Sequence, residues 1–505
     1  MRIAALLLPL LLCIVLPALA EPFVPGQTLD APLIARVTAS ALAFMQPRTL
    51  ELVPTWQLAM WGLRGLTTLD ERLAVDLREG MLRLSAGART LATRRAPGRD
   101  DAAGWGEATA QLVRVGWDAS EAVRRSGTQG VLRSFFDELF NHLDPYSRYA
   151  SPAEAQADRI RRAGRAGIGV ELARRRAGVE VREVAADGPA ALAGVRRGDR
   201  VLAVNGQTIA GADLASVGAL LGGPEGTGVS VAIRSPDGRV RTVSLVRALV
   251  PPETVKAVRI GDLLLLRISG FSSDTAARMA HEIEHGLQGR HPPRGLVLDL
   301  RGNPGGLLRQ AAAAANTLIP HGLVARTVGR NPAATHEFRA GGVDLAHGLP
   351  VVVMVDGRSA SAAEILAAAL ADEGRAVVVG SSTLGKGLVQ TITSLPDGGD
   401  LAITWSRVLA PLGWPIQGLG VLPQVCTSLG GEQLARQLAE LRQHQSLLQA
   451  ALIRHRSARA PLPPAEMLEI RSACPAAEGQ DADFSTAHML IETPPAYAAA
   501  LLPGG

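Results

Sequence analysis

The sequence predicts an α/β protein that is built from several domains. Between about residues 260 and 380, short apolar runs rich in β-branched residues alternate with helix-like segments, an order typical of parallel strands buried on both faces. The apolar runs lie at 263–268, 295–300, 351–355 and 376–379. Earlier in the chain, from about Gly164, short strands and glycine turns replace this pattern. The 505 residues suffice for about three domains.

The N-terminus has the features of a secretory signal peptide at residues 1–20. Arg2 supplies the positive charge, residues 3–15 form the apolar centre, and 18–20 resemble a small-residue cleavage site. We therefore expect an exported, periplasmic protein. The apolar run is of marginal length for a membrane span, so a protein tethered to the membrane by an uncleaved signal is the alternative.

The composition is that of an ordinary globular protein, with 47% hydrophobic and 20% charged residues. The formal net charge is +5, but no basic block is interleaved with aromatic residues, so we expect no nucleic-acid partner. Cys426 and Cys474 are the cysteines that follow the signal segment. In an oxidising compartment they form either one disulfide or two buried free thiols, and no residue pattern indicates a metal site.

Changes of pattern divide the rest of the chain into four regions. We expect a helical N-terminal region at 21–155, a domain of short strands at 160–250, an α/β core at 251–428 and a helical C-terminal region at 429–505. Apolar residues spaced by threes and fours predict individual helices in the first and last regions. These helices are expected at 50–66, 108–143, 432–455 and 464–473. Both helical regions are expected to serve packing or dimerisation.

The order of elements at 160–250 resembles that of a PDZ domain. The glycines at 167 and 169 stand where this family has its carboxylate-binding loop, whose backbone N–H groups hold the end of a peptide that adds as a strand. The resemblance makes the following residues candidates for peptide binding: Gly167, Ile168, Gly169, Val170, Leu172, Val217 and Leu221. The alternative is that the apolar side chains among them only form the core.

Ser361 and Lys386 form a candidate pair of nucleophile and base. Ser361 lies where the strand at 351–355 turns into the next helix, and Lys386 follows the strand at 376–379. Because parallel strands end at the same edge of a sheet, both residues are expected at that edge although they are distant in sequence. A serine beside an uncharged lysine is a nucleophile with its activating base.

The lysine content of the chain supports this pair. Lys and Arg together number 52, yet Lys256 and Lys386 are the only lysines. Lysine persists best where arginine cannot replace it, and a general base is such a position because a guanidinium effectively never loses its proton. Lowering a lysine pKa from about 10.4 to near 7 requires roughly 4–5 kcal/mol, which burial can supply.

Two alternative interpretations concern the residues around Ser361 and Lys386. Residues 361–364 fit a capping box, in which Ser361 only caps a helix. Residues 380–386 match the nucleotide-binding pattern GxxxxGK, but Gly387 replaces the Ser or Thr that binds magnesium. The sequence after Gly387 alternates like a strand where a phosphate loop needs a helix, so a P-loop-like nucleotide binder is a remote alternative.

A glycine-rich turn follows the strand at 295–300. Gly305 and Gly306 end the sequence DLRGNPGG and precede a helix-like segment at 307–318. Two glycines at a strand-to-helix turn leave backbone N–H groups free to bind an anion, as in an oxyanion hole, or they simply allow a tight turn.

Five motifs together resemble those of the C-terminal processing peptidases, also called tail-specific proteases. They are LDPYS at 143–147, DLRGNPGG at 299–306, SASAAE at 359–364, TLGKGLVQ at 383–390 and GWPIQGLGVLP at 413–423. The resemblance covers roughly residues 130–425 in the expected order. It implies a ClpP/crotonase-like α/β protease core with an inserted PDZ domain, helical N- and C-terminal regions and a Ser-Lys dyad.

Matched position by position, the resemblance assigns roles to individual residues. The nucleophile falls on Ser361 rather than Ser359, the base falls on Lys386, and Gln390 orients the base. Lys386 and Gln390 are four positions apart, which places them on one face if the segment between them is extended. The oxyanion hole is assigned to the backbone N–H groups of Ala362 and of either Gly305 or Gly306.

The chain departs from the family pattern at positions near these motifs. Ala363 stands in place of a frequent third serine, Leu384 in place of phenylalanine, and Gln424 in place of aspartate. None of the three belongs to the dyad, so we expect activity to remain while the shape of the substrate pocket differs. The regions before Leu143 and after Cys426 match the family poorly or not at all.

The resemblance implies a serine endopeptidase without a metal or nucleotide cofactor. Its PDZ domain holds the C-terminal tail of a protein or peptide substrate, and its dyad cleaves the chain through an acyl-enzyme. A regulatory adaptor and a homodimer are compatible with this function. The competing class is a binding module, in which the PDZ domain captures tails and the protease-like core is an inactive scaffold. The intact dyad and both glycines argue against that alternative.

Overall fold

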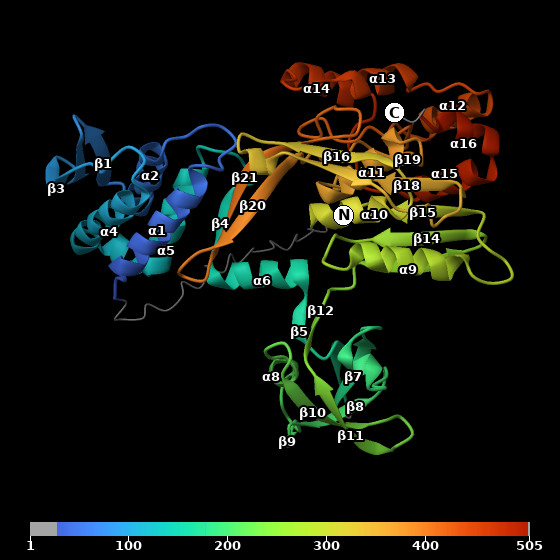
Figure 1. Ribbon diagram of the computed structural model, residues 1–505, viewed down its shortest axis with the longest axis horizontal. Helices are drawn as coiled ribbons and strands as arrows, with labels where there is room; N and C mark the ends of the chain where they lie inside the picture. The colour runs from blue at the N-terminus through green and yellow to red at the C-terminus, as the bar shows by residue number, and fades with distance from the viewer. Residues whose placement is uncertain (1–27, 177, 503–505) are drawn as a thin grey trace, which may run out of the picture. The chain divides into compact units, whose positions relative to one another are not determined.

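The computed structural model describes residues 28–176 and 178–502 (Figure 1). The signal segment expected at residues 1–20 lies outside the described residues. None of the described helices has the length and hydropathy that crossing a membrane requires. The described part of the chain forms two compact units, one of residues 28–40 with Thr55–His142, the other of Ala41–Pro54 with the described residues from Leu143 onward.

The first unit combines helices with a small antiparallel sheet. The helices are α1 (Ala31–Met45, divided between the units), α2 (Thr55–Leu63), α3 (Gly65–Leu69), α4 (Ala102–Ala119) and α5 (Glu121–Phe140). The sheet contains β1 (Leu73–Arg78), β2 (Met81–Ala86) and β3 (Arg89–Arg95). These strands were not predicted from the sequence, because charged residues interrupt their apolar alternation and only their Leu73, Leu82 and Leu84 are buried. The region that was expected to be helical is therefore mixed.

The second unit is organised around a six-stranded sheet. Its strand order is β13 (Val255–Ile260), β14 (Leu263–Ile268), β15 (Gly295–Asp299), β18 (Val351–Val355), β19 (Val377–Gly380) and β22 (Val425–Cys426). All neighbours are parallel except β13 and β14. Every residue of β15, β18 and β19 is buried, as strands covered on both faces require. The predicted α/β core is confirmed.

Helices cover both faces of this sheet (Figure 1). Alternate strand residues such as Leu298 and Val353 pack with α9 (Thr275–Leu287), α10 (Leu308–Ala315) and α11 (Ala362–Asp372). Their neighbours, such as Val297 and Val352, pack with the C-terminal helices α12 (Gly431–Arg442), α15 (Asp481–Glu492) and α16 (Pro494–Ala500). The C-terminal region, whose remaining helices are α13 (Gln449–Ser457) and α14 (Pro464–Arg471), is thus a layer of the core.

A second sheet extends the core. Its order is β17 (His336–Ala340), β16 (Gly322–Val328), β21 (Asp400–Leu409) and β20 (Leu388–Ser394), and β4 (Arg148–Ala150) pairs with β21. The segment 143–163, with the LDPYS turn, β4 and α6 (Pro152–Ala163), therefore belongs to the second unit and not to the N-terminal region expected to end at 155.

The PDZ domain is inserted between α6 and β13. Its entering and leaving strands, β5 (Arg165–Gly167) and β12 (Ala248–Val250), pair with each other in antiparallel fashion. The domain has its own sheet and its own hydrophobic core. The strands are β6 (Val170–Arg175), β7 (Gly178–Val184), β8 (Arg200–Val204), β9 (Gln207–Thr208), β10 (Gly228–Arg234) and β11 (Val240–Val246), with helices α7 (Pro189–Leu192) and α8 (Leu214–Leu221).

Cys426 and Cys474 form a disulfide, and both residues are fully buried. The sequence left this pairing open against two free thiols. The bond joins β22 to the segment that follows α14.

Candidate active site

Ser361 lies at the start of α11, just after the turn that follows β18. Its backbone has φ 56° and ψ −115°, a left-handed conformation that costs a non-glycine residue on the order of 1–3 kcal/mol. A helix cap normally has β-region backbone angles, so capping alone does not require this strain. A serine on a strained strand-to-helix turn is instead typical of an exposed nucleophile.

The carboxylate of Glu364 connects Ser361 to Lys386. Its Oε2 accepts hydrogen bonds from the backbone N–H of Ser361 at 2.7 Å and of Lys386 at 2.8 Å. Its Oε1 accepts from the backbone N–H of Gly385 at 2.6 Å and from the hydroxyl of Thr383. Because one oxygen atom serves both residues, the backbones of Ser361 and Lys386 lie next to each other, as the parallel strands predicted.

Glu364 is fully buried within the apolar helix α11. Burial raises the pKa of its carboxyl group, while hydrogen bonds from Thr383 and from the backbone partly oppose this change. The capping box that fits the sequence at 361–364 is present, but its acidic residue, Glu364, also accepts a hydrogen bond from the backbone N–H of Lys386. Glu364 was not predicted to have this function, although an acid in the first turn of a helix that is apolar from there to Asp372 at its end is a detectable signal.

The surroundings of Lys386 favour its uncharged form. Burial lowers the pKa of its amine, the positive charge of Arg148 lowers it further, and the carboxylate of Glu364 raises it. The Nζ atom lies 4.8 Å from the ring centroid of Tyr146, a contact that favours the charged form. Tyr146 belongs to the LDPYS turn, and sequence reasoning did not assign it a role.

Gln390 lies on β20 and its amide is held on the side of β21. Its Nε2 donates to the backbone oxygen of Leu388 and to Oγ1 of Thr404, both at 3.1 Å. The strand begins only at Leu388, and its pairing with β21 is irregular between Val389 and Gln390. Simple alternation therefore does not place Gln390 on the face of Lys386. Within the described part of the chain, no hydrogen bond joins the two side chains.

The glycine turn after β15 packs against Ser361. A Cβ atom on Gly305 would lie 2.8 Å from Cβ of Ser361 and 2.9 Å from the backbone nitrogen of Ala362, so only glycine fits there. The N–H of Gly305 already donates to Oδ1 of Asn303 at 2.8 Å. Among the described residues, Gly306 has no acceptor for its N–H. Ala362 is the first residue of α11, whose N–H has no partner within the helix.

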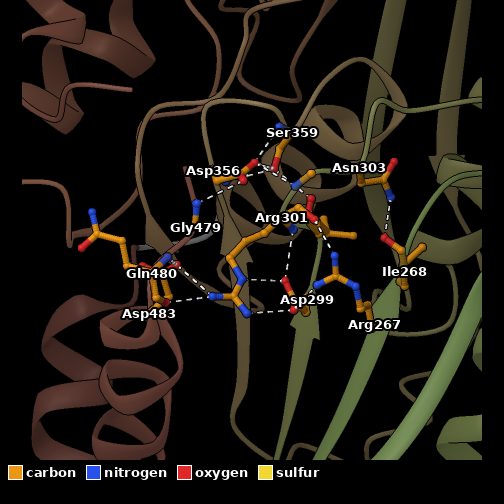
Figure 2. Close-up of polar contacts among 12 residues, drawn as sticks. Arg267, Ile268, Asp299, Arg301, Asn303, Asp356, Ser359, Gly479, Gln480 and Asp483 are labelled. Atoms are coloured by element: carbon orange, nitrogen blue, oxygen red, sulfur yellow. Dashed lines mark hydrogen bonds and ion pairs between the residues drawn. The ribbon is translucent and has the colours of Figure 1, made fainter. Parts of the chain in front are cut away.

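Buried polar groups brace the turns that precede these residues. Figure 2 shows Asp356, whose Oδ1 accepts from the backbone N–H of Gly302 at 2.9 Å, and Ser359, whose hydroxyl donates to the oxygen of Leu300 at 2.8 Å. Ser359 is fully buried and its hydroxyl is engaged, so it is unavailable as a nucleophile. Burial would raise the pKa of Asp299, but hydrogen bonds and charges of Arg301 and Arg267 lower it.

A cavity of about 1090 Å³ includes the predicted peptide groove of the PDZ domain, and residues beyond that domain, such as Lys256 of β13 and Arg278 of α9, also line it. Its lining includes six of the seven candidates for peptide binding, which are Gly167, Ile168, Gly169, Val170, Leu172 and Leu221. Val217 does not line it, because its side chain points into the PDZ core and is 0% exposed. Leu214 and Gly218, which occupy the same helix, line the cavity instead.

Comparisons with known proteins indicate the family to which the chain belongs. The model of peptidase family S41 matches residues 262–427, and a PDZ domain model matches residues 180–235. A carboxy-terminal-processing protease of Bartonella bacilliformis is 34% identical over 325 residues, which are 62% of this chain and 74% of the relative. A carboxyl-terminal-processing protease of Picosynechococcus is 34% identical over 289 residues, which are 55% of this chain and 69% of the relative.

Among solved structures, the photosystem II D1 C-terminal processing protease is 27% identical. The match covers 75% of this chain and 97% of that chain, with a TM-score of 0.36. The fold, the hydrogen bonds of Glu364 to Ser361 and Lys386, and the extent of the sequence matches all indicate the same family. The chain belongs to peptidase family S41, as a serine peptidase that is homologous to the carboxy-terminal-processing proteases and carries a PDZ domain.

Proposed function

We propose that the protein is an exported endopeptidase that binds protein substrates by their C-terminal tails and cleaves them at Ser361. The observation that carries this proposal is the shared carboxylate of Glu364, which holds the strained Ser361 beside the partly buried Lys386. The backbones of Ser361 and of a lysine with a lowered pKa thus lie together at one sheet edge, which supports their roles as nucleophile and base.

The reaction begins with Lys386 in its neutral form. The amine takes the proton of the Ser361 hydroxyl while Oγ attacks the carbonyl carbon of the scissile peptide bond. The resulting oxyanion accepts hydrogen bonds from the N–H groups of Ala362 and Gly306. Lys386 then gives its proton to the leaving amine, and the C–N bond breaks to leave an acyl-enzyme. A water molecule, deprotonated by Lys386, hydrolyses this ester and restores Ser361.

Of the two glycines, we assign the oxyanion hole to Gly306. The N–H of Gly305 is engaged by Asn303, so Gly305 serves instead to let the turn approach Ser361 closely. We propose that Gln390 orients Lys386 indirectly, through a chain in which Gln390 donates to Thr404 and Thr404 donates to Asp144, at the start of the turn that carries Tyr146.

Tail binding is supported by the cavity of the PDZ domain. Its glycine loop offers backbone N–H groups for a terminal carboxylate, and Ile168, Val170 and Leu172 offer an apolar lining for the last side chain. We therefore expect a preference for apolar C-terminal residues. Export is supported by the composition of residues 1–20 and by the buried disulfide, which suits an oxidising compartment such as the periplasm.

The test compares the wild-type protein with Ser361→Ala on a small protein substrate that ends in an apolar tail. We expect cleavage by the wild type and a loss of roughly a thousandfold or more in kcat for the variant. Lys386→Arg is expected to be equally inactive, although it keeps the charge, because a guanidinium cannot act as the base.

Mass spectrometry of an acid-quenched reaction should find the acyl group on Ser361. Turnover by Ser361→Ala at the wild-type rate would refute the proposal. Tail binding by a wild-type protein that cleaves nothing would instead identify an inactive binding module.

A further inference from the structure

The segment from Arg471 to Asp483 contacts the loops that follow β15, β18 and β19 in the candidate active site. We call this segment, from the last residue of α14 to the first turn of α15, the C-terminal strap. It lies beyond residue 427, where the match to the peptidase family model ends. The disulfide between Cys474 and Cys426 ties it to β22.

At the loop that precedes Lys386, the strap makes its contacts through the side chain of Arg471. Its guanidinium donates to the backbone oxygen of Thr383 at 2.9 Å and to that of Leu419 at 2.7 Å. The hydroxyl of Thr383 donates to Glu364, the carboxylate that accepts from the N–H groups of Ser361 and Lys386. Burial lowers the pKa of Arg471, and the charge of Glu364 raises it. Arg471 is thus connected to both proposed catalytic residues through two intermediates.

At the turn that precedes Ser361, the strap makes its contacts through its backbone atoms. The oxygen of Ala477 accepts from the N–H of Gly357 at 2.7 Å and from the hydroxyl of Ser381 at 2.9 Å. The N–H of Gly479 donates to Oδ2 of Asp356 at 3.2 Å (Figure 2). The strap therefore joins the turn before Ser361 to the loop before Lys386.

At the glycine turn, the strap acts through Asp483. This buried carboxylate accepts from Arg301 at 3.0 Å, and Arg301 also bonds both oxygens of Asp299 at the end of β15 (Figure 2). The other oxygen of Asp483 accepts from the hydroxyl of Thr427 at 2.6 Å. All three loops that follow β15, β18 and β19 are consequently fixed to one continuous segment.

We infer that the C-terminal strap is a positioning device for the reaction, and that Arg471 is a positioning residue acting through Thr383 and Glu364. This inference rests on the proposed function of Ser361 and Lys386. The loops join separate strands, so their mutual distances depend on the contacts that cross between them. A displacement of about 1 Å between reacting groups can cost on the order of a hundredfold in rate. Loss of the strap contacts should therefore slow the chemical step while substrate binding at the PDZ domain stays unchanged.

The test is a kinetic comparison of Arg471→Ala and Arg471→Lys with the wild type. We expect Arg471→Ala to lower kcat by about a hundredfold, with KM within twofold, and to slow the labelling of Ser361 by a fluorophosphonate to a similar extent. Arg471→Lys should recover part of both rates, because an ammonium can still donate to the two carbonyl oxygens. The matched control is Arg454→Ala, which removes an exposed arginine of the same region that pairs with Glu469, and it should behave as wild type.

Ser381→Ala is the second variant, in case Arg471→Ala does not fold. It removes only the hydroxyl that bonds Ala477, which costs less stability than the loss of a buried guanidinium, and we expect a several-fold loss of kcat in the folded variant. The inference is wrong if Arg471→Ala or, where that variant does not fold, Ser381→Ala keeps kcat within twofold of the wild type. It is also wrong if KM rises as much as kcat falls. Ser361→Ala is assayed in parallel, and its inactivity shows that such a failure concerns the strap and not the proposed function.

Discussion

At the scale of the residue, the site depends on the charge state of one amine. Lys386 takes a proton only when it is neutral, and burial together with Arg148 lowers its pKa toward that state. Glu364 and the ring of Tyr146 act in the opposite direction. The rate should therefore rise with pH as the amine of Lys386 loses its proton, over a range below that of an ordinary lysine.

Arg148 allows this balance to be tested. Replacing it by glutamine removes a positive charge, which raises the pKa of Lys386. A smaller fraction of the amine is then neutral at a given pH, so the rising limb of kcat/KM should move to higher pH. The matched control is Arg161→Gln, because Arg148 and Arg161 both pair with Asp158 but only Arg148 influences Lys386. Equal pH profiles for Arg148→Gln and the wild type would contradict this account.

At the scale of the element, parallel strands bring the site together. β15, β18 and β19 are neighbours in one sheet, so the loops at their carboxyl ends meet at one edge. The backbone oxygen of Asn303 accepts from the N–H of Ala360 at 2.9 Å, which joins the glycine turn to the turn of Ser361. The disulfide then holds β22, the outermost strand, to the segment that braces these loops.

Removal of the disulfide should destabilise the folded protein. The two cysteines are 48 positions apart, and closing a loop of that length lowers the entropy of the unfolded chain by the equivalent of about 4 kcal/mol. Dithiothreitol should therefore lower the urea midpoint of the wild type toward that of Cys426→Ser/Cys474→Ser. The double variant is the control, since its own midpoint should not respond to the reductant. A wild-type midpoint that dithiothreitol leaves unchanged would count against a stabilising disulfide.

At the scale of the whole molecule, the PDZ domain and the candidate active site belong to parts with separate hydrophobic cores. The PDZ domain has its own buried cluster, and the sheet that carries the loops of the candidate active site packs between two other hydrophobic clusters. A substitution in the PDZ cavity should accordingly affect KM and leave the chemical step intact.

Leu172→Asp tests this separation. Leu172 is a half-buried residue of the cavity, and a charge there should raise KM for a substrate with an apolar tail by about tenfold or more, with kcat preserved. The matched control is Leu192→Asp, which changes a PDZ leucine that is 82% exposed and lies outside the cavity. A fall in kcat with KM unchanged would show that the cavity does not select tails.

The sequence by itself determined the fold class, the four strands β14, β15, β18 and β19, and the location of Ser361, Lys386 and the glycine turn at the ends of these strands. These features are local: β18 is a continuous apolar run, and the motifs lie at strand ends where glycine, serine and lysine have specific chemical uses. The order of short strands and glycine turns was likewise sufficient to indicate the PDZ domain.

Only the tertiary structure decided which distant groups meet. It placed Val217 in the core, engaged Gly305 with Asn303, shifted the pairing of β20 before Gln390, and brought Tyr146 to Lys386. It also made the C-terminal region a layer of the core and placed its strap against the catalytic loops. The physical reason is that periodicity records which face of a segment is buried, whereas a contact between residues far apart in the chain depends on how the segments pack.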